Sequence, residues 1–228
     1  KVYIDEYSGA PLLEHQTLEG YCGSATQQCV LRSFGVRNLP KQRRGESKPD
    51  IWCEHIASLA RESSASGNNG TTEGERLELK TKVVSGSVSY CEFLTTLRAG
   101  LANPNCRVAC NYLRSGLTGF ESSGLARYFP TTLLMKIFAG HFSPILGIVE
   151  QDGDTCQHES MLASSSLCGS EEKKSDEDEA MDNPLVAIFD TNAKYGGTYF
   201  VPARRLYESV HAVDVGSNKN RAIILIEK

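Results

Sequence analysis

The order in which helix-like and strand-like hydrophobic patterns follow one another along the chain constrains its fold more than any other feature of the sequence. Apolar residues recur at helical spacing in 22–34, from Asp50 onward and in 90–101, where Ser89 and Glu92 form a capping-box pair. Strand-like runs lie at 77–83, 107–113, 142–149, 185–190 and 222–227, and Pro202 is placed to start a helix over 203–211. Helices that come early and strands that dominate later predict an α+β fold with an antiparallel sheet, not a βαβ alternation.

The chain is long enough, at 228 residues, for one domain with its own core, and we expect a single domain over 1–228. Two stretches interrupt the pattern and are interpreted as insertions. The segment 120–139 is poorly periodic, and 151–183 is polar and predicted to be disordered. The second segment holds ten Asp or Glu and two Lys, a net charge of −8. Since the whole chain has a net charge of −4, the other residues together carry +4.

The composition excludes several classes of partner. No stretch approaches the roughly 20 consecutive apolar residues of a membrane-spanning helix, so we expect no membrane partner. Lys and Arg are scattered, which gives no electrostatic footprint for nucleic acid. The chain starts at Lys1 with no visible signal peptide, and this start is interpreted as a cut, so targeting cannot be read from it. The free thiols favour a cytoplasmic location. A homodimer is left open.

Eight cysteines are spread along the chain, too far apart for a small disulfide scaffold. They contain no Cys-x-x-Cys motif. The closely spaced pairs have no second pair of Cys or His residues at the spacing of zinc ligands, so we expect neither a disulfide framework nor a metal site. The remaining interpretation is a reducing compartment in which most thiols are buried hydrophobes and one is reactive.

Cys22 is the candidate for that reactive thiol. It stands at the start of the helix expected over 22–34, where the helix dipole and unpaired N–H groups favour a thiolate and can stabilise an oxyanion. Gln16, six residues earlier, has a side-chain amide that could complete an oxyanion hole. The alternative is that Gln16 is an ordinary polar loop residue.

His141 is the candidate base for the thiol. It follows Gly140 and leads the apolar run 142–148, where a strand would present an imidazole over a cleft. Asp190 ends the next apolar run. If the two runs are antiparallel neighbours, the start of one lies beside the end of the other, and Asp190 can accept a hydrogen bond from His141. The alternative for a strand-end aspartate is turn initiation.

Three separated segments together resemble the catalytic domain of phytochelatin synthase, a family of papain-like cysteine transpeptidases. They are Gln16-Thr17 with Tyr21-Cys22-Gly23, then Gly140-His141-Phe142-Ser143-Pro144-Ile145, then Phe189-Asp190 with Tyr199-Phe200-Val201-Pro202. The order Cys, His, Asp agrees with the family, whereas the middle of the chain matches only by pattern. The resemblance implies a papain-like fold, with a helical half that carries the nucleophile at a helix N-terminus and a sheet half that carries His and Asp.

The resemblance also implies a reaction. Cys22 would attack the Cys–Gly bond of glutathione, Gln16 would help to hold the oxyanion, and His141, oriented by Asp190, would protonate the departing glycine. Another glutathione or a phytochelatin peptide would then take the γ-glutamylcysteinyl group, which makes chains that chelate heavy metals. Cadmium or zinc would enter as the metal–glutathione thiolate, so neither a bound cofactor nor a metal ligand is implied. The expected substrate-binding residues are Tyr21, Gly23, Gly140 and Lys194.

One departure keeps alternatives open. The family usually has an arginine three residues after the aspartate, and Ala193 stands at that position, followed by Lys194. Lys194, Arg204 or Arg205 could compensate, or all three could be surface charges. A glutathione hydrolase or a general papain-like peptidase is therefore a close alternative. An alternative of another class is a non-catalytic, thiol-rich metal-binding module.

Overall fold

The computed structural model describes residues 3–4, 9–44, 48–65, 77–117, 140–150, 183–214 and 218–228. The expected insertion 120–139, and all but the last residue of the expected insertion 151–183, lie outside the described residues. The helices in the described part of the chain are all too short or too polar to cross a membrane.

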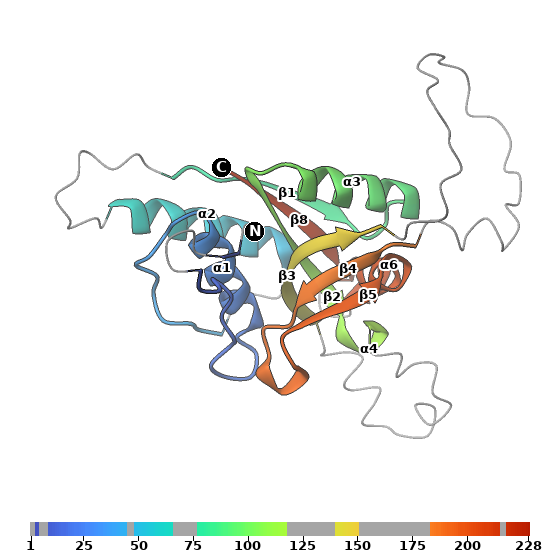
Figure 1. Ribbon diagram of the computed structural model, residues 1–228, viewed down its shortest axis with the longest axis horizontal. Helices are drawn as coiled ribbons and strands as arrows, with labels where there is room; N and C mark the ends of the chain where they lie inside the picture. The colour runs from blue at the N-terminus through green and yellow to red at the C-terminus, as the bar shows by residue number, and fades with distance from the viewer. Residues whose placement is uncertain are drawn as a thin grey trace, which may run out of the picture.

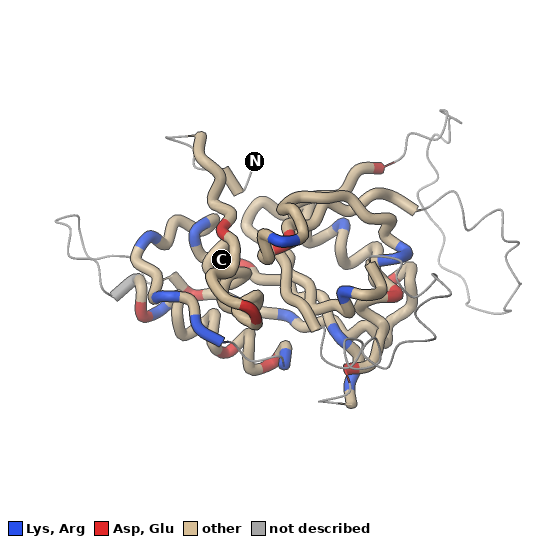
Figure 2. Tube along the Cα trace, turned by 90° about the horizontal axis from the view of Figure 1, so that it is seen from below, with Lys and Arg blue, Asp and Glu red and all other residues tan. Residues whose placement is uncertain are grey.

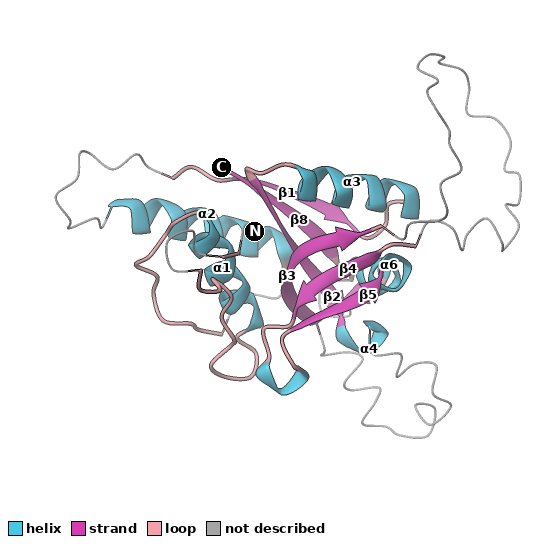
Figure 3. Cartoon of the chain, viewed as in Figure 1, coloured by secondary structure: helices cyan, strands magenta, loops and turns pink. Residues whose placement is uncertain are grey.

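A six-stranded sheet, antiparallel throughout, forms the centre of the fold (Figures 1 and 3). Its strands are β1 (Lys80–Ser85), β2 (Cys106–Leu113), β3 (Gly140–Val149), β4 (Leu185–Phe189), β5 (Thr198–Pro202) and β8 (Ala222–Glu227), in the spatial order β1-β8-β2-β3-β4-β5. A separate ribbon pairs β6 (Val213–Asp214) with β7 (Lys219–Asn220). The α+β class with an antiparallel sheet, as predicted from the sequence, is confirmed.

Helices cover both faces of the sheet (Figure 1). On one face lie α1 (Cys22–Ser33) and α2 (Pro49–Ala65), and on the other lie α3 (Tyr90–Ala102) and α6 (Ala203–His211). The short helix α4 (Arg114–Leu117) follows β2 and packs against α6, and the 3₁₀ turn η2 (Ala193–Tyr195) follows β4. Acidic and basic residues are interspersed along the described chain (Figure 2).

The strand β8 shows why the central strands are apolar runs and not alternating ones. Ile223 belongs to the cluster under α3 and α6, whereas Ile224 and Ile226 belong to the cluster under α1 and α2. Successive side chains point to opposite faces, and both faces are covered by helices, so positions 222–226 are all apolar and only Glu227, at the end of the strand, is charged.

The expected elements are observed close to their expected boundaries except for one strand, and the observed elements α4, η2, β5, β6 and β7 were not among those expected. Ser89 caps α3 by accepting a hydrogen bond from the Glu92 N–H at 3.2 Å, as the capping-box pair predicts. The strand expected at 77–83 is observed at 80–85, because Leu77 is buried against the α1–α2 side without joining the ladder. β5 was not among the expected strands, since its positions do not alternate and Phe200 is exposed.

Candidate active site

The pairing of β3 with β4 brings His141 and Asp190 together. The two strands are antiparallel neighbours, with Ile145 opposite Ile188, so that the start of β3 lies beside the end of β4. Nε2 of His141 lies 3.0 Å from Oδ1 of Asp190. Both residues are buried, at 5% and 1% exposure, so water does not compete for this hydrogen bond.

Asp190 is held by more than the histidine. The Asn192 N–H donates to its Oδ1 at 2.8 Å, and the Arg114 guanidinium forms an ion pair with its Oδ2. Arg114 also stacks over the ring of Tyr195, with Cζ 3.3 Å from the ring centroid. Burial favours the neutral acid, but the hydrogen bond with His141 and these donors outweigh it and lower the pKa of Asp190. The carboxylate is therefore ionised and oriented on both oxygens.

Arg114 was missed in the sequence, since an arginine at the end of an apolar strand is usually a solvated charge. Only the order of the strands, which places β2 beside β3, shows that it reaches Asp190.

Cys22 is the first residue of α1 and is half-buried. Its thiol is hydrogen-bonded to His141, and the backbone N–H groups of Phe142 and Gly23 also donate to the sulfur. Since Nε2 of His141 is engaged by Asp190, Nδ1 is the ring nitrogen left to face Cys22. Burial alone would raise the pKa of the thiol, but these hydrogen bonds and the charge of His141 outweigh it and lower the pKa.

The pKa of His141 is shifted in the opposite direction. Burial favours the neutral imidazole, but the hydrogen bonds and charges of Asp190 and Cys22 dominate and raise the pKa of His141 to about 9. A lowered thiol pKa beside a raised imidazole pKa favours transfer of the thiol proton to the imidazole, and thus a thiolate–imidazolium pair. The structure thus brings together Cys22, His141 and Asp190 in the order in which a cysteine nucleophile, its base and an orienting carboxylate operate.

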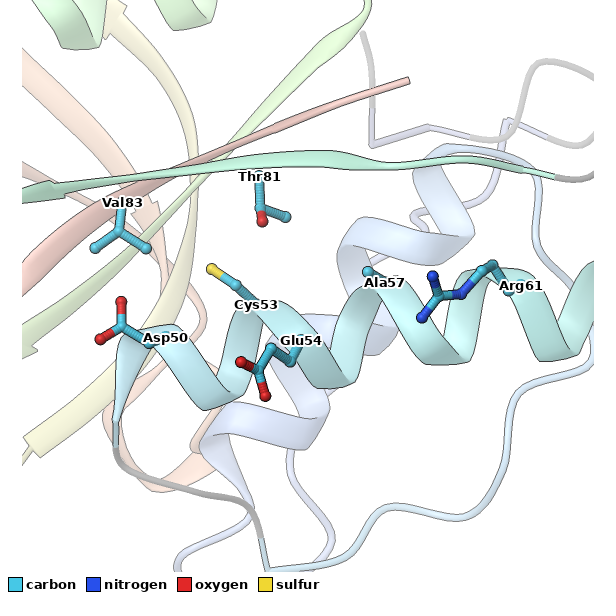
Figure 4. A pocket seen from close by; sticks show the side chains of 7 residues that line it. All are labelled: Asp50, Cys53, Glu54, Ala57, Arg61, Thr81 and Val83. Carbon is cyan, nitrogen blue, oxygen red and sulfur yellow. The ribbon is translucent and has the colours of Figure 1, made fainter.

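The six cysteines within the described residues are free thiols, and they differ in reactivity. Burial raises the pKa of Cys29 to about 12 and of Cys53 to about 11, and it also raises the pKa of Cys106 and Cys110. Cys53 illustrates the difference: it lines a pocket of about 550 Å³ between α2 and β1, where its thiol faces Thr81 (Figure 4). Of these thiols, Cys22 is the one with a lowered pKa, so it is the candidate nucleophile.

Gln16 is anchored beside the triad. Its N–H donates to the carbonyl of Thr191, the residue after Asp190, at 2.6 Å. Its side-chain oxygen Oε1 is buried and has no hydrogen-bond partner. Tyr21 precedes α1 and supplies no side-chain cap, so the N–H groups of the first turn are not occupied by a cap. An oxyanion hole needs donors, and the candidate donors here are the Nε2–H groups of the Gln16 amide and the N–H groups at the uncapped start of α1.

Lys194 lies apart from this group. Its side chain is 76% exposed, and Nζ lies 3.6 Å from Oε2 of Glu19, which is equally exposed. Of the other two basic residues considered in its place, Arg204 stacks over the ring of Tyr90 at 4.1 Å, and Arg205 is exposed. The structure therefore brings none of the three side chains into contact with Cys22 or His141.

Arg221 is a second residue that sequence reasoning missed. It directly precedes β8 and is only 3% exposed. Its Nη1 reaches Asn111 and Asp214, each at a long 3.4 Å, while its Nε and Nη2 are buried without an acceptor. Burial lowers the pKa of the guanidinium, and Asp214 only partly opposes this. A buried cation with unmade hydrogen bonds is costly to the fold, which suggests a ligand that supplies the missing acceptors.

The position of Arg221 links it to the triad. It lines a pocket of about 570 Å³ that also includes Lys48 and Asp214. Gly140, the residue before His141, lies so close to the guanidinium that a Cβ there would be 3.0 Å from Nη1 of Arg221. The Arg221 side chain therefore lies against the backbone of the residue that precedes the histidine.

No protein-family model matches the chain, and no curated protein matches it significantly. Among the described residues, no three His, Cys, Asp or Glu side chains are grouped so as to hold a metal ion.

Proposed function

We propose that the chain is a cysteine transpeptidase of the phytochelatin synthase type, with a papain-like arrangement of a nucleophile helix against a sheet that carries the histidine and the aspartate. The observation that carries the proposal is the Cys22 thiol hydrogen-bonded to His141, whose Nε2 lies 3.0 Å from Asp190. The pKa directions of the pair support a thiolate that is ready to attack and an imidazolium that is ready to donate.

The first half-reaction uses both charges of the pair. The Cys22 thiolate attacks the carbonyl carbon of the Cys–Gly bond in glutathione, and the carbonyl oxygen becomes an oxyanion near the N-terminus of α1 and the Gln16 amide. His141 then donates its proton to the glycine nitrogen, the C–N bond breaks and glycine leaves. A γ-glutamylcysteinyl thioester on Cys22 and a neutral His141 remain.

The second half-reaction reverses the proton movement. The α-amine of another glutathione or of a phytochelatin attacks the thioester carbon, His141 takes up the proton, and the Cys22 sulfur leaves as thiolate. The product is longer by one γ-Glu-Cys unit. Cadmium or zinc enters as part of a metal–glutathione thiolate substrate, so this chemistry needs no ligand set in the protein.

The pocket at Arg221 supports a glutathione-like donor. Glutathione carries two carboxylates and an ammonium group, and the pocket is lined by Asp214 and by Arg221, a buried cation with two nitrogens that lack an acceptor. A planar guanidinium binds a carboxylate through two parallel hydrogen bonds, which matches the Nε and Nη2 of Arg221. We infer that one carboxylate of the donor binds there while its scissile bond lies over Cys22.

A hydrolase of the same fold is the second candidate. Ala193 stands where the family has an arginine, and Lys194 next to it is exposed and faces Glu19. An acceptor carboxylate would then be held weakly, and water would compete with the acceptor amine for the thioester. The metal-binding module is less well supported, because buried thiols with raised pKa values, such as Cys29 and Cys53, are poor ligands for a soft metal.

Incubation of the protein with glutathione, with and without cadmium, separates these candidates when the products are identified by mass. We expect γ-Glu-Cys oligomers and free glycine, whereas γ-glutamylcysteine with glycine would establish the hydrolase. Cys22→Ser is expected to abolish both, and Cys53→Ser is the matched control that retains activity. Equal product from Cys22→Ser, or no product from the wild type, would overturn the proposal.

A further inference from the structure

Trp52 lies where the nucleophile helix α1, the helix α2 and the histidine strand β3 meet. It belongs to α2, is 1% exposed and is the only tryptophan of the chain. Its indole Nε1 donates to the Gly23 carbonyl at 2.9 Å. Its ring stacks on the ring of Phe142, with centroids 5.4 Å apart and an angle of 6° between the planes.

The two residues that Trp52 contacts in this way have a common role. Gly23 and Phe142 are the residues whose backbone N–H groups donate to the Cys22 sulfur. Gly23 follows Cys22 in α1, and Phe142 follows His141 in β3. Hydrogen bonds to a thiolate are charge-assisted and depend on distance and direction, so a small shift of either backbone segment weakens them.

The contact at Gly23 is close. A Cβ on this glycine would lie 3.4 Å from Cδ1 of Trp52 and 3.6 Å from Cδ2 of Phe142. The two aromatic rings therefore pack directly on the backbone of the first turn of α1, and no side chain separates them from it.

Trp52 is itself held in place. Its carbonyl accepts a hydrogen bond from Nε2 of Gln27 at 3.0 Å, and Oε1 of Gln27 lies 2.8 Å from Nδ1 of His55. Gln27 is buried in α1, and His55 lies in α2. These hydrogen bonds join α1 and α2 next to Trp52. They hold its ring in place against α1 and β3.

We propose that Trp52 is a positioning residue of the active site, which fixes the backbones of Gly23 and Phe142 so that both N–H groups point at the Cys22 sulfur. It touches neither the substrate nor the reacting atoms. The inference rests on the proposed function in one respect, namely that Cys22 is the nucleophile.

The single tryptophan allows a test at the level of one atom. Replacement of tryptophan by β-(3-benzothienyl)alanine during expression changes this position alone, keeps the shape of the ring and substitutes sulfur for the Nε1–H. Trp52→Phe removes the same donor and provides an independent variant. The readout is the pH dependence of iodoacetamide alkylation at Cys22, followed by the mass of the peptide that contains it.

We expect the pKa of Cys22 to rise by about one unit in both proteins, which means about tenfold less thiolate below the pKa. In turnover of glutathione, kcat is expected to fall while KM changes little, since the substrate contacts remain. Because alkylation requires no turnover, a shifted titration without activity toward glutathione would support the positioning role and count against the proposed function.

The matched control is Phe93→Leu. Phe93 is fully buried on the opposite face of the sheet, where it packs edge-on against Tyr207. The loss of this aromatic contact is expected to lower the melting temperature without a change in the Cys22 titration. An unchanged Cys22 pKa in both Trp52 proteins, or the same shift in Phe93→Leu, would overturn the proposal.

Discussion

Arg114 and Asp190 form an ion pair on the side of the carboxylate that faces away from the histidine. Oδ2 accepts from the guanidinium, and Oδ1 lies 3.0 Å from Nε2 of His141. The side chains of Arg114 and Asp190 are 15% and 1% exposed, so the pair is shielded from water. Arg114 therefore acts on the histidine through Asp190, by keeping this carboxylate ionised and fixed in direction.

Arg114→Met tests this role. Without the guanidinium, a buried carboxylate oxygen lacks its donor, the pKa of Asp190 rises, and the orientation of His141 is lost in part. We expect kcat/KM to fall roughly tenfold or more, in keeping with the loss of one hydrogen bond to a charged group. Arg98→Met is the matched control, because Arg98 pairs with the exposed Glu150 and is expected to leave kcat/KM unchanged.

The titrations of the thiol and the imidazole set the pH range of activity. The pKa of Cys22 is lowered and that of His141 is raised to about 9, so the thiolate–imidazolium pair exists between these two values. Below the pKa of Cys22 the nucleophile is protonated, and above about 9 the imidazole has no proton to give to glycine. We expect a bell-shaped profile of kcat/KM with a basic limb near pH 9, which initial rates from pH 4 to 11 would check. A basic limb near 6.5 would contradict the ion pair.

The same pair affects stability. The folded-state pKa of His141 lies above the ordinary value of 6.5, so its contribution is complete below that value and is lost as the pH rises through about 9. The lowered pKa of Cys22 contributes at high pH, and this contribution is lost as the pH falls through the folded-state value.

Asp190→Asn separates the charge of the carboxylate from its hydrogen bond. The amide oxygen can still accept from Nε2 of His141, but the negative charge that raises the histidine pKa is gone. We expect the basic limb of the pH profile to move downward by about 1 to 3 units and the acylation rate to fall. Glu150→Gln, the same change in an exposed ion pair, is expected to leave the limb in place. The limb is measured from single-turnover release of glycine.

The placement of the triad was within reach of the sequence, whereas its surroundings were not. The apolar runs after Gly140 and before Asp190 predict two strands, and an antiparallel pairing then puts His141 beside Asp190. Arg114 and Arg221 carry no such signal, because each lies beside a strand end and an exposed arginine fits the same pattern. Their positions near His141 and Asp190 follow from the strand order β8-β2-β3-β4, which is a tertiary property.

Arg221→Met tests the proposed donor pocket through opposite effects on stability and binding. The variant removes a 3% exposed cation with two unmade hydrogen bonds and replaces it by an apolar side chain of similar length. We expect the melting temperature of the free protein to rise or stay constant, because the desolvation cost of the buried cation is removed and its ion-pair partner Asp214, whose side chain is 20% exposed, can be solvated by water instead. Glutathione, in contrast, is expected to bind at least tenfold more weakly, since a charge-assisted contact with its carboxylate is lost. Saturating glutathione is expected to raise the melting temperature of the inactive variant Cys22→Ser. The rise should be smaller in the double variant that carries both Cys22→Ser and Arg221→Met. An undiminished shift in the double variant would place the carboxylate of glutathione elsewhere.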